Sequence, residues 1–164
     1  MTHEYLKKDA LRPSHQGFTK SFKKVLMTTA LLLSLAIANA ATITSTAAGG
    51  TWSTGSTWVG GIAPGSADTV IIAGTATVTL SAATTITNLT VNIGGKLNIG
   101  TVNALTVSNN FVNNGTFTGT TGRLYLTGTA GSFTNTGTFT FGAGRVYFYG
   151  NLVSLGTQDR KSVV

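Results

Sequence analysis

Two consecutive stretches of this chain have nearly the same sequence, offset by 22 residues. Residues 111–128 read FVNNGTFTGTTGRLYLTG, and residues 133–150 read FTNTGTFTFGAGRVYFYG. The matches include the opening Phe, the Asn-x-Gly-Thr-Phe-Thr run, the Gly-Arg pair and the Tyr two residues after the Arg. A third copy begins at Leu152, and residues 89–107 form a degenerate copy of similar length. So many matched positions in register predict a chain built from equivalent structural units.

Each unit reads as strand, turn, strand. Residues 123–127 (RLYLT) and 145–149 (RVYFY) alternate between two kinds of position, which predicts strands with one buried face and one solvent face. β-branched and aromatic residues fill the strand positions, while Gly and Asn stand at the breaks. No window after residue 40 has the apolar spacing of a helix, so the sequence predicts an all-β fold.

The period favours a solenoid among the all-β architectures. In a solenoid each coil lies on the previous one, so equivalent residues stack at about 4.8 Å, which gives a reason for identical residues at identical positions. Residues 41–158 are long enough for about five or six such coils. The inward stacks expected from the repeat are Phe111 on Phe133, Phe117 on Phe139, Leu124 on Val146, Leu126 on Phe148, and a hydrogen-bonded ladder of Asn113 and Asn135.

The chain begins with the three-part layout of a secretory signal. Residues 1–24 are polar and rich in Lys, residues 25–38 (VLMTTALLLSLAIA) are apolar, and Ala38-Asn39-Ala40 has the small-x-small pattern that a signal peptidase reads. The apolar run is shorter than the roughly 20 residues needed to span a bilayer. We therefore predict a signal-peptide helix within residues 1–40, cleavage after Ala40, and a location outside the cell or on its surface, with membrane contact only during export.

The last six residues, 159–164 (DRKSVV), differ in composition from the Thr, Gly and Asn-rich sequence before them. They resemble the translated read-through of a sequencing adaptor, and we interpret them as a sequencing or truncation artefact. Between the signal and this tail, we expect an N-terminal cap with the first strands in residues 41–80 and repeated coils in residues 81–158.

Charge is concentrated at the two ends of the chain. The net charge is +7, but residues 41–158 contain three basic residues (Lys96, Arg123 and Arg145) against one acidic residue, Asp68, which leaves +2. This balance excludes a basic face for nucleic acid in the body of the protein. Asp68 is expected to cap or pin the loop that follows Pro64.

The same segment lacks the residues of most catalytic sites. Residues 41–158 contain no His, Cys or Glu. Neither a pair of catalytic carboxylates, nor a metal-binding cluster, nor a triad with a histidine base can be assembled from them. We therefore predict that the segment is not an enzyme and has no catalytic residue, no metal site and no cofactor.

Three groups of residues are candidates for ligand contact, and each also has a purely structural interpretation. Arginine and tyrosine in one outward register suit sugars, acidic polymers or a protein partner, or else stabilise stacked coils. Flat Thr-x-Thr ranks resemble those of ice-binding solenoids, although Thr is also a common exposed strand residue. The two tryptophans suit a terminal cap better than sugar stacking. The groups are Arg123, Tyr125, Arg145, Tyr147 and Tyr149, with Thr127 alongside; Thr116, Thr118, Thr138 and Thr140; and Trp52 and Trp58.

The N-terminal part of this segment carries a resemblance. The pattern W-x-x-x-x-x-W-x-G-G-x-x-P-x-x-x-D-x-V begins at Trp52, and it is followed by L-T-V at Leu89 and G-G-x-L at Gly94. These motifs resemble exported bacterial surface proteins with right-handed parallel β-helix passengers, including adhesins and autotransporter-like passengers, and the eight-glycine domain that opens some extracellular β-helix proteins. The resemblance implies a right-handed parallel β-helix but no active-site residue.

The resulting expectation is a non-catalytic, structural and adhesive segment of a secreted or cell-surface bacterial protein. Its expected partners are carbohydrate or cell-surface polymers. Two alternatives stay open: an ice-binding Thr-rich solenoid, and the non-catalytic stem of a polysaccharide-active enzyme.

Overall fold

The computed structural model describes residues 40–101 and 104–149 with their side chains, and residues 151–154 as backbone. The predicted signal-peptide helix and the tail at residues 159–164 lie outside the described residues. Among the residues that are described, no helix is long and apolar enough to cross a membrane.

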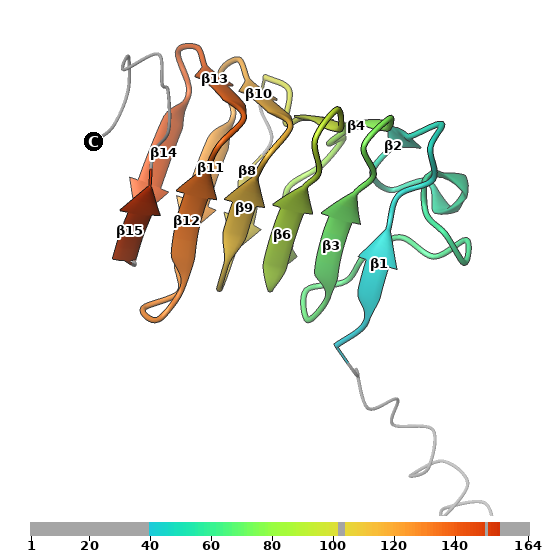
Figure 1. The fold of residues 1–164 in the computed structure, drawn as a ribbon, viewed down its shortest axis with the longest axis horizontal. Coiled ribbons are helices and arrows are strands. Elements are labelled where there is room, and N and C mark those ends of the chain that lie inside the picture. The colour runs from blue at the N-terminus through green and yellow to red at the C-terminus, as the bar shows by residue number, and fades with distance from the viewer. Residues whose placement is uncertain (1–39, 102–103, 150, 155–164) are drawn as a thin grey trace, which may run out of the picture. The chain divides into compact units, whose positions relative to one another are not determined.

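Within the described residues, the strands of each sheet pair in parallel, and they form three sheets (Figure 1). The first sheet contains β1 (Thr42–Thr44), β3 (Thr69–Ile72), β6 (Asn88–Val91), β9 (Phe111–Asn113), β12 (Ser132–Asn135) and β15 (Asn151–Ser154). The second contains β2 (Gly50–Thr51), β4 (Thr77–Thr79), β7 (Lys96–Asn98), β10 (Thr116–Gly119) and β13 (Thr138–Phe141). The third contains β5 (Thr84–Ile86), β8 (Ala104–Val107), β11 (Arg123–Leu126) and β14 (Arg145–Phe148).

Successive strands along the chain visit the three sheets in turn, so the fold is a parallel β-solenoid, as predicted. In Figure 1 the chain rises along the strands of the first sheet, crosses through the second and returns behind through the third while advancing toward the C-terminus, which is a right-handed winding. Between β3 and β14 the described residues form four complete coils, with partial coils before and after. The length of residues 41–158 allows about five or six coils; fewer of them are complete in the described residues, because the chain between β1 and β3 forms an irregular coil without a third strand.

The 22-residue repeat places matched residues side by side. Phe117 pairs with Phe139, and Phe111 pairs with Phe133, each in the predicted register. The ring centroids of these pairs are 5.2 Å and 5.1 Å apart. Leu152, the start of the predicted third copy, pairs with Phe133 through the backbone, 19 residues on. The inward stacking on which the sequence interpretation depends is therefore confirmed.

The core changes in character along the first sheet. One inward column runs from Val70 through Leu89 to Phe111 and Phe133, and all four side chains are buried. The residue offset between neighbouring strands in this column is 19 from Val70 to Leu89, 22 from Leu89 to Phe111 and from Phe111 to Phe133, and 19 from Phe133 to Leu152. The length of a coil therefore does not follow the size of its inward side chain, since the coil that starts at Leu89 is as long as the one that starts at Phe111.

Each repeat unit contains three strands, where the sequence pattern suggested two. The expected turn at Asn113 and Asn135 is the corner between β9 and β10, where only Asn114 and Gly115 separate the strands. A Cβ atom at Gly137 would collide with the carbonyl oxygen of Gly115 in the coil below, so the corner needs glycine for close backbone stacking. Asn113 and Asn135 stand at this corner, buried, and the Nδ2 of Asn113 donates to the Oδ1 of Asn135 at 2.6 Å. The predicted asparagine ladder is therefore confirmed.

The irregular first coil ends in a loop that contains both tryptophans. Trp58 is 1 % exposed and Trp52 is 3 % exposed, with their ring centroids 4.9 Å apart in an edge-to-face arrangement. The Nε1 of Trp58 donates to the carbonyl oxygen of Trp52 at 2.7 Å. A single antiparallel bridge joins Trp58 to Ser45 beside β1, which folds the loop back onto the first coil. This packing is what a terminal cap requires.

Candidate functional site

Arginine and tyrosine residues from neighbouring coils form one outward surface on the third sheet, which we call the Arg–Tyr surface. Arg123 pairs with Arg145 and Tyr125 pairs with Tyr147 between β11 and β14. The two phenol rings are stacked, with centroids 4.8 Å apart and planes only 8° apart. The alternation of each strand sends Leu124 and Val146 into the core, and this fixes the arginines and tyrosines on the opposite face.

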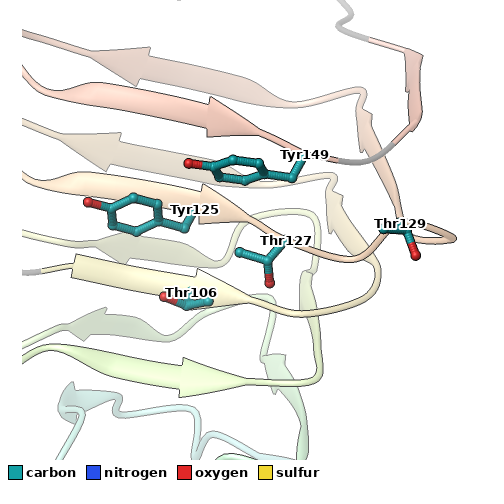
Figure 2. Close-up of a pocket in the computed structure, with 5 residues that line it drawn as sticks. All are labelled: Thr106, Tyr125, Thr127, Thr129 and Tyr149. Atoms are coloured by element: carbon teal, nitrogen blue, oxygen red, sulfur yellow. The ribbon is translucent and has the colours of Figure 1, made fainter.

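A hollow of about 670 Å³ lies beside this stack, lined by Thr106, Tyr125, Thr127, Thr129 and Tyr149 (Figure 2). Thr106 of β8 pairs with Tyr125 of β11. A small hydroxyl side chain therefore lies next to a large aromatic one where the two coils meet, which leaves space beside the tyrosine ring. Tyr149, which follows β14, is 61 % exposed. Aromatic rings beside hydroxyl groups suit a sugar, which presents both apolar C–H faces and hydroxyls.

The single acidic residue of residues 41–158 does not neutralise the positive charge of the Arg–Tyr surface. Arg123 and Arg145 are both exposed and stand opposite each other on adjacent strands. Like charges opposite each other in a sheet repel, so an anion placed between them relieves an unfavourable interaction. Asp68, the only acidic residue between positions 41 and 158, instead accepts hydrogen bonds from the backbone nitrogens of Ala41 and Gly65. The prediction that Asp68 pins its loop is confirmed by the second of these bonds.

The predicted threonine ranks lie on the second sheet in the expected register. Thr116 pairs with Thr138 and Thr118 with Thr140. The structure adds a rank that the sequence comparison missed: Thr77 and Thr79 of β4 occupy the same outward columns two coils earlier. The intervening rank on β7 consists of Lys96 and Asn98, so the threonine face is interrupted. β4 carries the same Thr-x-Thr pattern, but only the strand pairing shows that it stands in the same columns as the later ranks.

A ladder of polar side chains on the outward side of the first sheet was also not predicted. The Nδ2 of Asn88 donates to the Oγ1 of Thr69 at 3.0 Å, and the Oδ1 of Asn88 accepts from the backbone nitrogen of Asn110 at 3.1 Å. In the next coil the Oδ1 of Asn110 accepts from both the backbone nitrogen and the hydroxyl of Ser132. Because these groups bond to one another along the coil axis, the ladder serves to hold the coils in register.

The tryptophans are placed differently from the other candidates. Both rings are buried in the first coil, so neither presents a face on which a sugar could stack in this structure. Trp52 and Trp58 therefore contribute to packing at the end of the solenoid, as the capping interpretation expects.

The described part of the chain has no cluster of side chains suited to acid–base catalysis or metal binding. There, no group of three or more His, Cys, Asp or Glu residues lies close enough to hold a metal ion. The arginine, tyrosine and threonine side chains described above can donate hydrogen bonds to a ligand, and residues 41–158 contain no histidine and no second carboxylate to activate a hydroxyl beside them.

Comparison with protein-family models, with curated proteins and with solved structures gives no match to this chain.

Proposed function

We propose that this chain is a non-catalytic, adhesive β-solenoid segment of a secreted or cell-surface bacterial protein, and that the Arg–Tyr surface contacts anionic carbohydrate. The observation that carries the proposal is the in-register pairing of Arg123 with Arg145 and of Tyr125 with Tyr147 on one exposed sheet face. Guanidinium groups bind carboxylates and sulfates through paired hydrogen bonds. Phenol rings next to them pack against the apolar face of a sugar ring.

The hollow beside the stack supports carbohydrate as the ligand class. Its three threonines and two tyrosines supply hydroxyl groups around an open, shallow site, and a polymer that runs along the surface can enter and leave such a site from either end. The stacked coils hold these side chains at fixed spacing, so the surface is preorganised and little conformational entropy is lost on binding. Export, which the N-terminal sequence pattern predicts, would bring the surface into contact with extracellular polymers.

The test is binding of the exported protein to an immobilised anionic polysaccharide such as polygalacturonate, with neutral dextran as the comparison. We expect the double variant Arg145→Ala with Tyr147→Ala to lose affinity about tenfold or more, because both central contacts are removed. Lys96→Ala is the matched control, since it removes one exposed positive charge from the second sheet and should leave binding within about twofold.

Salt dependence separates specific contact from general attraction. Binding through the arginines should weaken as salt is raised, while the tyrosine contribution should persist. Equal binding of the double variant and the unmodified protein would contradict the proposal, and so would equal retention on dextran and polygalacturonate.

The second candidate function is ice binding, which the extra rank at Thr77 and Thr79 favours. Three of four consecutive coils then present Thr-x-Thr on the second sheet. This function predicts thermal hysteresis that is lost in Thr118→Tyr and retained in Arg145→Ala. Hysteresis that is absent from the unmodified protein removes this candidate.

A further inference from the structure

Ala41 is held at both its backbone groups by the turn that precedes β3. Its nitrogen donates to the Oδ1 of Asp68 at 2.9 Å, and its carbonyl oxygen accepts from the nitrogen of Thr69 at 2.8 Å. The next residue, Thr42, opens β1 and pairs with Thr69. Both backbone hydrogen-bonding groups of Ala41 are therefore fixed by this end of the first sheet.

The Asp68 carboxylate that meets Ala41 is itself fixed in place. Its second oxygen, Oδ2, accepts from the backbone nitrogen of Gly65 at 2.7 Å, which closes the turn. The carbonyl oxygen of Asp68 accepts from the nitrogen of Thr87 at 2.9 Å in the following coil. The carboxylate is thus aimed at the Ala41 nitrogen by a turn and by the neighbouring coil together.

We propose that Asp68 is the receiving site for the new amino terminus that forms when the peptide bond between Ala40 and Ala41 is hydrolysed during export. The idea rests on the export component of the proposed function, because Ala38-Asn39-Ala40 is the predicted signal-peptidase site. Hydrolysis adds one water across the bond, so Ala40 departs with a carboxylate and the Ala41 nitrogen becomes an ammonium group at neutral pH. The hydrogen bond at 2.9 Å from a neutral amide to the carboxylate then becomes an ion pair between the same two atoms.

The position of the cleavage decides whether this ion pair forms. A chain that began at Thr42 would lack both backbone bonds of Ala41. A chain that kept one additional residue would retain the amide hydrogen bond but move the positive charge about 3.8 Å along the backbone. Only cleavage after Ala40 places the ammonium group directly against the Asp68 carboxylate. The correctly processed chain is therefore more stable than a chain cleaved at another position.

The experiment begins with the full precursor expressed in a bacterium that exports it, and intact mass identifies the first residue of the product. Thermal unfolding is then compared between the product that starts at Ala41 and a variant with one Gly inserted between Ala40 and Ala41. At pH 6 we expect the Ala41 product to have a Tm higher by about 1–4 °C, the range for a partly exposed ion pair in a domain of this size. Asp68→Asn keeps an oxygen acceptor and should abolish the difference between the two chains.

A pH series tests the same idea without changing Asp68. The ion pair needs the ammonium form of the new amino terminus, so the advantage is present at pH 6 and is lost as the pH rises through and above the range of α-amino groups, about 7.7–8.0. Equal Tm values for the two chains at pH 6, or a difference that persists in Asp68→Asn or at pH 10, would overturn the inference. A product that starts elsewhere than Ala41 would also overturn it. Polysaccharide binding is measured on a different sheet, so loss of the adhesive function leaves these outcomes unaffected.

Discussion

Replacement of Phe117 by alanine is the sharpest test of the stacked core. Phe117 is fully buried, and its ring centroid lies 5.2 Å from those of both Phe111 and Phe139 and 6.1 Å from that of Phe141. Truncation removes most of a buried aromatic side chain in the middle of a column, which costs about 3–5 kcal/mol. A described segment of this length has a total stability on the order of 6–16 kcal/mol, so the loss is a large fraction of the whole.

Phe117→Leu is the informative companion variant. Leu97 occupies the equivalent position in the preceding coil and is fully buried there, so leucine fits this column and should cost less than about 1.5 kcal/mol. Thr118→Ala, on the outward side of the same strand, is the surface control and should stay within about 0.5 kcal/mol of the parent.

The measurement is urea unfolding of the full chain followed by circular dichroism, with the midpoint and the slope fitted separately. The alanine variant should move the midpoint strongly without changing the slope, because the same surface is exposed on unfolding. If Phe117→Ala and Phe117→Leu both cost less than about 1 kcal/mol, Phe117 does not lie in a dry column and the register of β10 against β13 is wrong.

Two further substitutions address the corner and the cap. Gly137→Ala should destabilise the chain by at least about 1 kcal/mol in urea unfolding, because the new Cβ would collide with the carbonyl oxygen of Gly115. Gly65→Ala is the control and should change stability by less than that, because its Cβ would make only an ordinary contact at 3.6 Å. Trp58→Phe should cost about 1–3 kcal/mol in the same assay, because it leaves the buried carbonyl oxygen of Trp52 without its 2.7 Å donor, and an unchanged midpoint would contradict the capping role.

The sequence predicted the parts of the fold that depend on repetition. Phe111 and Phe133, or Tyr125 and Tyr147, are recognisable as equivalents because residues 111–128 and 133–150 match at many positions with a constant offset of 22. Stacking then follows from the geometry of any solenoid. The paired arginines and tyrosines of the candidate surface were found in the same way.

The parts that escaped prediction lie where the coil length changes. Thr77 and Thr79 join the threonine face through strand offsets of 19 and 20 residues, with Lys96 and Asn98 between them and the next threonine rank. Because the residues around β4 do not match those of the two repeated copies, aligning the sequence with itself does not show that β4 stacks in register with β10. The third strand of each unit also escaped, because the sequence pattern assigned one turn to a unit in which two corners separate β9, β10 and β11.

The shared register of residues 111–128 and 133–150 has a consequence for how such a chain can change in length. The two copies pair residue by residue in all three sheets. A gene duplication of this 22-residue unit would again place Phe on Phe and Tyr on Tyr, so the solenoid would lengthen by one coil with the same inward and outward side chains.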